Sequence, residues 1–321
     1  MIPHVPIIDV SGDPKRVAAA IDDACSKVGF FQIVGHGLDP VLERDAWRAA
    51  VDFFALDLED KMDVAIPPGG AYGYAPFQGE RLAASLGVAT PPDLKETFSC
   101  GPFDTAGLAV GSVDPAAVFV QSQTPWPASL PGMAPAWRDY YAALEALTAD
   151  VMRLMAIGLG LDPLYFDPFI DQHTSALRAL QYPDLGGRRP DAGQLRAGAH
   201  TDYGTLTLLR QDDAPGGLQV TGTDGEWHDV PSTPGAYVVN VGDALERWTN
   251  DRWRSTLHRV VTPPLDAGAD CTRRSMAFFH NANWDAAIEC IPTCLEPGAS
   301  PRYAPISAGN HLMEKFRKAQ Y

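Results

Sequence analysis

Positive charge is scarce in this chain of 321 residues. Its 25 lysine and arginine residues are outnumbered by 40 aspartate and glutamate residues, which gives a formal net charge of −15 at pH 7. A field of that sign repels phosphate groups, so we expect no nucleic-acid partner and no binding to an anionic membrane surface. Long apolar runs are also missing, because no stretch approaches the roughly 18 uncharged residues of a membrane-spanning helix. Any anionic ligand therefore needs a local basic anchor.

Cysteine is scarce and shows no paired pattern. The five cysteines are an odd number, in a chain too long to need disulfide bonds for its stability: Cys25, Cys100, Cys271, Cys290 and Cys294. The last two are separated by three residues, but no second Cys/His pair lies nearby to complete a zinc site. Residues 1–13 lack the basic and apolar regions of a secretory signal. We therefore expect free thiols and a cytoplasmic protein.

Neither repeats nor linker-like segments divide the chain. Hydrophobic residues make up 45% of the sequence and charged residues 20%, which is ordinary for a globular protein with a buried core. Large β-rich domains commonly exceed 200 residues as one unit. We therefore predict a single domain over residues 1–321, with a helix-rich part (1–175), a β-rich core (176–285) and a C-terminal segment that ends in a helix (286–321).

The first half of the chain carries helix signals. Asp-Pro pairs at residues 13–14 and 39–40 are typical of an N-cap followed by proline, and apolar residues recur at helical spacing after each pair. Between these two helices, Phe30 to Val34 predicts a strand. Residues 137–161 predict a long helix with one apolar face. Residues 64–132 are rich in glycine, proline and alanine, which indicates long irregular segments that could line a pocket.

After residue 174 the pattern changes to short apolar runs separated by turn residues. These runs predict strands at residues 176–182, 199–211, 217–221, 226–230, 236–241, 257–262 and 273–281, with a final helix near 307–319. The fold class that we predict is therefore mainly β with flanking helices, a double-stranded β-helix or jelly roll.

One of these predicted strands carries a pair of metal ligands. His200 and Asp202 are two residues apart, and the period of a strand places both side chains on one face. His258, on another predicted strand, supplies a third ligand. Two histidines and one carboxylate form the facial triad that leaves coordination positions open on Fe(II).

The order of several motifs gives a specific resemblance. His200-x-Asp202, then His258, then Arg273-x-Ser275 resembles the 2-oxoglutarate/Fe(II)-dependent oxygenases of the isopenicillin N synthase-like type. Further similar segments span nearly the whole chain: residues 5–9, 29–37, 73–74, 93–96, 216–220 and 240–243. The resemblance implies Fe(II) as cofactor, 2-oxoglutarate and O2 as cosubstrates, and Arg273, Ser275 and Tyr182 as the 2-oxoglutarate site. It also implies oxidative decarboxylation to succinate and CO2, coupled to hydroxylation, desaturation or cyclisation of a small molecule.

Chemistry agrees with that assignment, because a guanidinium binds a carboxylate through two hydrogen bonds and a hydroxyl adds a third donor. On a strand, Arg273 and Ser275 share one face. The chain departs from the family pattern at Leu180, where many members have asparagine, and at Arg210, where an apolar or aromatic residue is usual. If no bulge interrupts the strand, counting by two from Asp202 places Arg210 inward, about 26 Å along the strand and too far from the metal to touch a substrate. If Arg210 faces outward instead, it is a surface charge. Candidates for the substrate pocket are Tyr72, Tyr74, Tyr203, His280 and Arg302.

Two alternatives stay open from the sequence. One is an oxidase of the same fold that does not consume 2-oxoglutarate, since isopenicillin N synthase retains an Arg-x-Ser pair. The other is a jelly roll that binds a metal without catalysis, which a broken triad or a missing anion anchor would favour; neither defect is present. The substrate, the type of oxidation and the oligomeric state are not indicated.

Overall fold

An eight-stranded sheet forms the centre of the molecule. The computed structural model describes residues 5–103, 122–264, 267–268 and 270–319. The strands of this large sheet follow one another in the order β1 (Ile7–Asp9), β2 (Phe30–Val34), β10 (Tyr237–Val241), β7 (Leu206–Gln211), β12 (Arg273–His280), β5 (Ala176–Tyr182), β4 (Glu96–Cys100) and β3 (Gly73–Ala75). All neighbouring pairs are antiparallel except β1 and β2.

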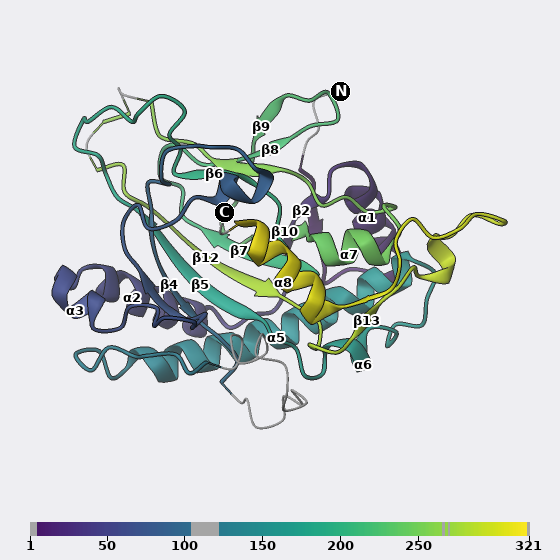
Figure 1. Cartoon of the computed structure of the whole chain (residues 1–321). Coiled ribbons are helices and arrows are strands. Elements are labelled where there is room, and N and C mark those ends of the chain that lie inside the picture. The colour runs from purple at the N-terminus through teal and green to yellow at the C-terminus, as the bar shows by residue number, and fades with distance from the viewer. Residues whose placement is uncertain (1–4, 104–121, 265–266, 269, 320–321) are drawn as a thin grey trace.

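A second, smaller sheet lies above the large one in the view of Figure 1. Its strands are β6 (Ala197–His200), β11 (His258–Val260), β8 (Leu218–Thr221) and β9 (Trp227–Asp229), all antiparallel. A short pair, β13 (Ala287–Ile288) and β14 (Ile306–Ser307), completes the strands of the described residues. Two antiparallel sheets of this kind confirm the predicted jelly roll.

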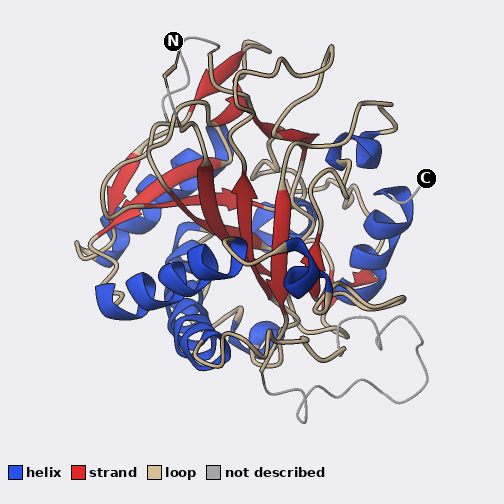
Figure 2. Cartoon of the chain, turned by 90° about the vertical axis from the view of Figure 1, so that its left-hand side faces the viewer, coloured by secondary structure: helices blue, strands red, loops and turns tan. Residues whose placement is uncertain are grey.

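Helices cover one face of the large sheet, and the C-terminal helix lies on the other side (Figure 2). Asp13 and Asp39 cap the first two helices, because their carboxylates accept hydrogen bonds from the backbone N–H of Arg16 and Val41. The helices are α1 (Pro14–Lys27), α2 (Pro40–Phe54), α3 (Leu58–Met62), α5 (Met133–Gly158), α6 (Asp167–Ile170), α7 (Asp243–Trp248) and α8 (Ala308–Ala319), with 3-10 turns η1 (Leu82–Leu86) and η2 (Pro292–Cys294).

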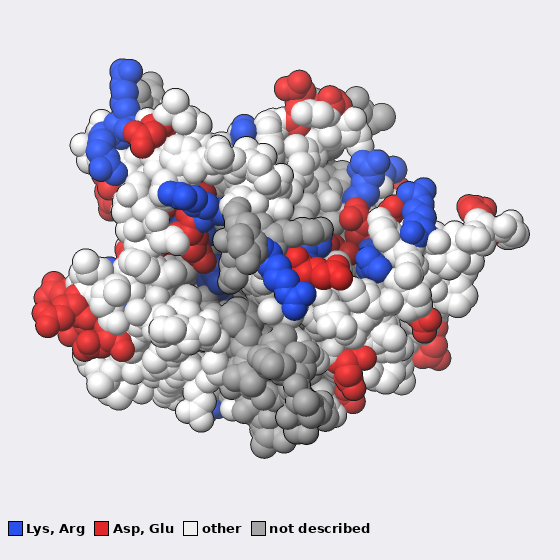
Figure 3. Space-filling model, in the orientation of Figure 1, with Lys and Arg blue, Asp and Glu red and all other residues white. Residues whose placement is uncertain are grey.

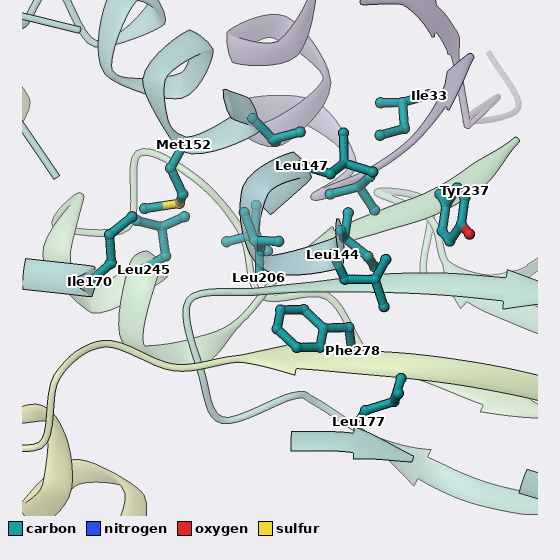
Figure 4. Close-up of a cluster of buried hydrophobic side chains, with 14 of the residues drawn as sticks. Ile33, Leu144, Leu147, Met152, Ile170, Leu177, Leu206, Tyr237, Leu245 and Phe278 are labelled. Carbon is teal, nitrogen blue, oxygen red and sulfur yellow. The ribbon is translucent and has the colours of Figure 1, made fainter. Parts of the chain in front are cut away.

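The main core lies between α5 and the large sheet. Leu144 and Leu147 of α5 face Leu206 of β7 and Phe278 of β12, and all four side chains are buried (Figure 4). We call this helix-covered side the outer face of the large sheet, and the side toward the small sheet its inner face. Within the described residues, no helix combines the length and apolar character needed to cross a membrane.

Several predicted elements are confirmed and one is corrected. The strands at 30–34 and 176–182 and the helices after residues 13 and 39 are confirmed. The strand predicted at 199–211 is two strands, β6 and β7, which belong to different sheets. The irregular segment predicted at 64–132 contains β3 and β4, while its residues 104–121 lie outside the described part. The large sheet contains strands from both the helix-rich part and the β-rich core.

Charged side chains are unevenly spread over the surface. Acidic residues gather over α3, where Asp57, Glu59 and Asp60 are exposed (Figure 3). Lysine and arginine side chains on the same face lie next to acidic ones rather than in one broad patch.

Candidate active site

Three predicted ligands meet between the two sheets. In the small sheet His258 lies directly opposite His200, and their ring centroids are 4.2 Å apart. Asp202 follows two residues after His200, and its Oδ1 lies 3.9 Å from Nε2 of His200 and 3.7 Å from Nε2 of His258. One potential ligand atom from each of the three residues lies within 4.8 Å of the others. The structure therefore brings the predicted triad together around one point.

Hydrogen bonds fix which nitrogen of each histidine faces that point. Nδ1 of His200 lies 2.7 Å from the carbonyl oxygen of Gly198, and Nδ1 of His258 lies 3.1 Å from that of Thr256. Because a carbonyl only accepts, each Nδ1 carries the proton and donates it. Both Nε2 atoms are then free of hydrogen and able to bind a metal. Burial, followed by the neighbouring His258, lowers the pKa of His200 to about 3, so this ring is neutral at pH 7.

Asp202 is oriented in the same way through its second oxygen. Its Oδ2 accepts hydrogen bonds from Oγ1 of Thr207 at 2.6 Å and from Nδ2 of Asn240 at 2.7 Å, which leaves Oδ1 facing the histidines. Burial alone would raise the pKa of Asp202, but the two histidines and these two donors outweigh it and hold the pKa below its usual range. The carboxylate is therefore an anionic, pre-oriented ligand. Two neutral imidazoles and one carboxylate suit Fe(II).

The predicted anion anchor lies on the inner face of the large sheet. Arg273 of β12 is opposite Tyr182 of β5, and Ser275 is opposite Leu180, so the four side chains share that face. Arg273 is 1% exposed and its Cζ lies 5.1 Å from the centre of the Tyr182 ring. Its Nη2 donates to Oε1 of Gln211 at 2.7 Å, whereas the buried Nη1 has no hydrogen-bond partner among the described residues. A buried, unpaired guanidinium nitrogen marks a place for an anionic ligand.

Of the five predicted substrate residues, Tyr203 lies near the triad. It directly follows Asp202, its ring lies 5.7 Å from that of Phe316 in α8, and it is partly buried. Burial and then the charges of Asp243 and Asp202 raise its pKa. Tyr72 is buried at the end of β4, where its ring contacts the backbone of Gly101.

The other three candidates are placed elsewhere, and their assignment is corrected. Tyr74 is on the outer face, where its hydroxyl donates to Glu96 at 2.6 Å. Phe279 is opposite Thr207, which binds Asp202, so Phe279 faces inward. His280, the next residue, therefore faces outward with Phe278. Arg302 is at the surface, and its guanidinium binds Asp251 at 2.6 Å. These contacts argue against a substrate role for Tyr74, His280 and Arg302.

Arg210 is also on the outer face, contrary to the prediction that it points inward. Its Nε donates to Oε1 of Glu43 in α2 at 2.6 Å, and its Cζ lies 3.5 Å from the ring centre of Trp47. The error arose at residues 201–205, which form no strand and connect β6 in one sheet to β7 in the other. Counting by two through that connection assigned every residue of β7 to the wrong face.

A charged cluster on the inner face was not predicted. Arg178 of β5 donates from Nε to Oγ of Ser99 at 2.8 Å, and its Nη1 lies 3.3 Å from Oε1 of Glu80. Oε2 of Glu80 lies 3.0 Å from Nζ of Lys95, and Arg178 also lies over the ring of Phe279 at 5.9 Å. Burial would raise the pKa of Glu80, but Lys95 and then Arg178 hold it at about 2. Strand alternation could have indicated that Arg178 lies on the same face as Tyr182, because the two residues are four positions apart in β5.

Comparisons with known proteins agree with this site. The 2OG-Fe(II) oxygenase superfamily matches residues 173–282, and the N-terminal family of the non-haem dioxygenases in morphine synthesis matches residues 5–129. The 2-oxoglutarate-Fe(II) type oxidoreductase hxnY of Emericella nidulans is 32% identical, over 98% of this chain and 90% of its own. The homoarginine-6-hydroxylase 2-ODD-233 of Oryza sativa is 31% identical, over 97% and 96%.

A solved structure is similar over nearly the whole fold. A full-length protein of Neurospora crassa, in complex with alpha-KG and thymine, superposes with a TM-score of 0.84 and is 33% identical, with 99% of this chain and 97% of that chain covered. The resemblance inferred from the motifs is thus confirmed. The chain belongs to the 2OG-Fe(II) oxygenase superfamily and is a dioxygenase that uses Fe(II), 2-oxoglutarate and O2.

Proposed function

We propose that His200, Asp202 and His258 hold Fe(II), that Arg273, Ser275 and Tyr182 hold the distal carboxylate of 2-oxoglutarate, and that the enzyme oxidises a small polar molecule. The observation that carries this assignment is the buried Nη1 of Arg273, which has no partner among the described residues and lies on the inner face of the large sheet, toward the small sheet that carries His200 and His258. The donor set fits a divalent iron, and the unpaired guanidinium nitrogen fits a carboxylate.

Each group has a defined task in the reaction. When bound, iron, 2-oxoglutarate and O2 supply the oxidising chemistry and release succinate and CO2. The two imidazoles and Asp202 fix the metal, and Thr207 and Asn240 keep the carboxylate turned toward it. Arg273 fixes the far end of the cosubstrate, so that its chelating end is directed to the metal. The relatives that match this chain are 2-oxoglutarate-Fe(II) oxygenases, and this favours the reaction over that of an oxidase that does not consume 2-oxoglutarate.

The inner-face cluster favours a planar, polar substrate. Arg178 and Glu80 form an ion pair on this face, Arg178 lies over the ring of Phe279, and Tyr203 directly follows Asp202 in the chain. An aromatic surface beside paired donors and acceptors suits a small heterocycle with carbonyl and N–H groups. The Neurospora crassa protein, which is similar along nearly its whole length, was crystallised with thymine, a molecule of this kind. We propose hydroxylation, desaturation or cyclisation of such a heterocycle in the cytoplasm, a location that the five free thiols support.

The test is the formation of succinate from 2-oxoglutarate by the Fe(II)-loaded enzyme, with pyrimidines, purines and amino acids offered as substrates. His200→Ala and Asp202→Ala are expected to abolish both turnover and Fe(II) binding while the protein stays folded. His228→Ala is the matched control, because His228 binds Asp224 at the surface of β9 and is not a ligand. Normal iron affinity in either triad variant would contradict the metal assignment. Arg178→Met should reduce turnover of the best heterocycle without changing the affinity for 2-oxoglutarate.

A further inference from the structure

A second buried arginine lies beside the 2-oxoglutarate site. Arg196, directly before β6, is 2% exposed, and its Cζ lies 6.0 Å from the centre of the Tyr182 ring. The guanidinium of Arg273 lies 5.1 Å from the centre of the same ring. Two cations therefore flank Tyr182, although they come from different sheets.

Arg196 is held in place by neutral groups. Its Nη1 donates to the carbonyl oxygen of Pro215 at 2.7 Å, and its Nη2 donates to that of Cys271. Among the described residues, no carboxylate forms an ion pair with Arg196 or Arg273. The nearest acid is Asp212, whose carboxylate accepts instead from the backbone N–H groups of Arg274 and Ala214.

The balance of charge leaves room for an anion. Asp212 offsets one of the two guanidiniums, and a buried cation that has only carbonyl partners remains costly. The cost of this buried positive charge appears in the pKa of Arg196, which burial and then the charge of Arg273 lower. The distal carboxylate of 2-oxoglutarate, bound by Arg273, would bring the missing negative charge to within the range of both cations.

We infer that Arg196 is a positioning residue of the cosubstrate site: it orients the Tyr182 ring and places a second positive charge behind the subsite of the distal carboxylate. Arg273 makes the direct contact, and Arg196 acts through Tyr182 and through its field. The two carbonyls fix its guanidinium before the ligand arrives, so binding requires little reordering of this side chain. This inference rests on the proposed site of Arg273, which the binding of 2-oxoglutarate to the wild-type protein tests separately.

The experiment compares two oxoacids that chelate metal in the same way. 2-Oxobutyrate has the 2-oxoacid group of 2-oxoglutarate but no distal carboxylate. Each is titrated into anaerobic Fe(II)-loaded protein, and the ratio of the two dissociation constants measures recognition of the distal carboxylate alone. If wild-type protein does not prefer 2-oxoglutarate, the proposed site of Arg273 fails. If it does, Arg196→Met should reduce the preference at least about tenfold, the effect of a charge lost about 12 Å from a carboxylate at an effective dielectric constant near 20, and more if the charge is closer.

Two further variants separate charge from mere packing. Arg196→Lys keeps the charge, so its preference should stay within about threefold of wild type. Arg259→Met is the matched control, because Arg259 in β11 is also a partly buried arginine over an aromatic ring, 4.1 Å from the centre of Trp227, and should leave the preference unchanged. Two results would overturn the inference. One is an unchanged preference for 2-oxoglutarate in Arg196→Met, even with a lower melting temperature. The other is a preference in Arg196→Lys that is as low as in Arg196→Met. If Arg196→Met does not fold, Arg196→Gln takes its place with the same expected loss, because its amide can still donate hydrogen bonds to the two carbonyls but carries no charge.

Discussion

Replacing Thr207 with valine tests how much the orientation of Asp202 contributes to iron binding. Thr207 is 4% exposed, and its Oγ1 donates to Oδ2 of Asp202 at 2.6 Å, so the hydroxyl binds the oxygen that does not face the metal. Valine keeps the branched shape and removes the donor. Asn240 still donates to the same oxygen, which keeps the carboxylate near its place.

The magnitude follows from the kind of hydrogen bond. A bond to a charged group contributes about 1.5–3 kcal/mol, and about 1.4 kcal/mol corresponds to a factor of ten. We therefore expect the dissociation constant for Fe(II) to rise about 10- to 100-fold in Thr207→Val. Loss of comparable groups that orient metal ligands has effects of about this size. The fold should persist, since the change replaces the hydroxyl with a methyl group of similar size.

The assay is anaerobic competition for Fe(II) between the protein and a chromogenic chelator. Thr221→Val in β8 is the matched control, because the hydroxyl of Thr221 donates to a neutral carbonyl, that of Leu257, at 3.2 Å. Its iron affinity should equal that of the wild type. An unchanged iron affinity in Thr207→Val would refute the idea that this contact pre-orients the ligand. A loss of the same size in both variants would point to general destabilisation instead.

Three further outcomes follow from the contacts. Arg273→Ala should raise the KM for 2-oxoglutarate at least about 30-fold, because losing one partner of a buried charge pair costs about 2–5 kcal/mol, and an unchanged KM would favour the oxidase alternative. Glu80 has a pKa of about 2 in the folded protein against an ordinary 4.5, so its carboxylate stabilises the fold above pH 4.5 and that contribution is lost as the pH falls toward 2. Urea titrations of wild type and Glu80→Gln should thus differ by up to about 3 kcal/mol near neutral pH and converge in acid, and a constant difference would contradict the ion pair with Lys95. Arg210→Leu should keep kcat/KM within about threefold of wild type but lower the melting temperature, because Glu43 loses its ion-pair partner. A 100-fold loss of kcat/KM would show instead that Arg210 binds a substrate.

Local features were predictable from the sequence because they depend on neighbours along the chain. The caps at Asp13 and Asp39 and the strand at 176–182 follow from short motifs and from periodicity, and the structure has them at those positions. His200 and Asp202 share a face for the same reason. His258 joined them through the resemblance to a family, since nothing local shows that residues 200 and 258 are opposite each other in one sheet.

Features that depend on long-range pairing were not predictable. Arg178 looks like any charged residue in a strand. Alternation along β5 places it on the face of Tyr182, but only the pairing of β5 with β12 shows that this is also the face of Arg273. Arg196 is equally inconspicuous in sequence. Its burial becomes apparent once Pro215 and Cys271, distant in the chain, supply the carbonyls that bind it. The residues chosen for the substrate pocket were aromatic or basic residues near motifs, and a side chain near a motif in sequence can still point to the other face.

The errors at Arg210 and His280 have one physical origin, the alternation of side chains along a strand. The count for Arg210 ran through residues 201–205, where the chain leaves one sheet for the other and alternation stops. The prediction for His280 depended on its position directly after Phe279, but adjacent residues of a strand face opposite sides. The contact of Thr207 with Asp202 shows the orientation of both residues. It places Thr207 on the inner face, and Phe279, which is opposite Thr207, lies on the same face. This hydrogen bond therefore identifies the inward-facing residues of β7 and β12, and with them the side chains that can meet a substrate beside Asp202, the proposed metal ligand.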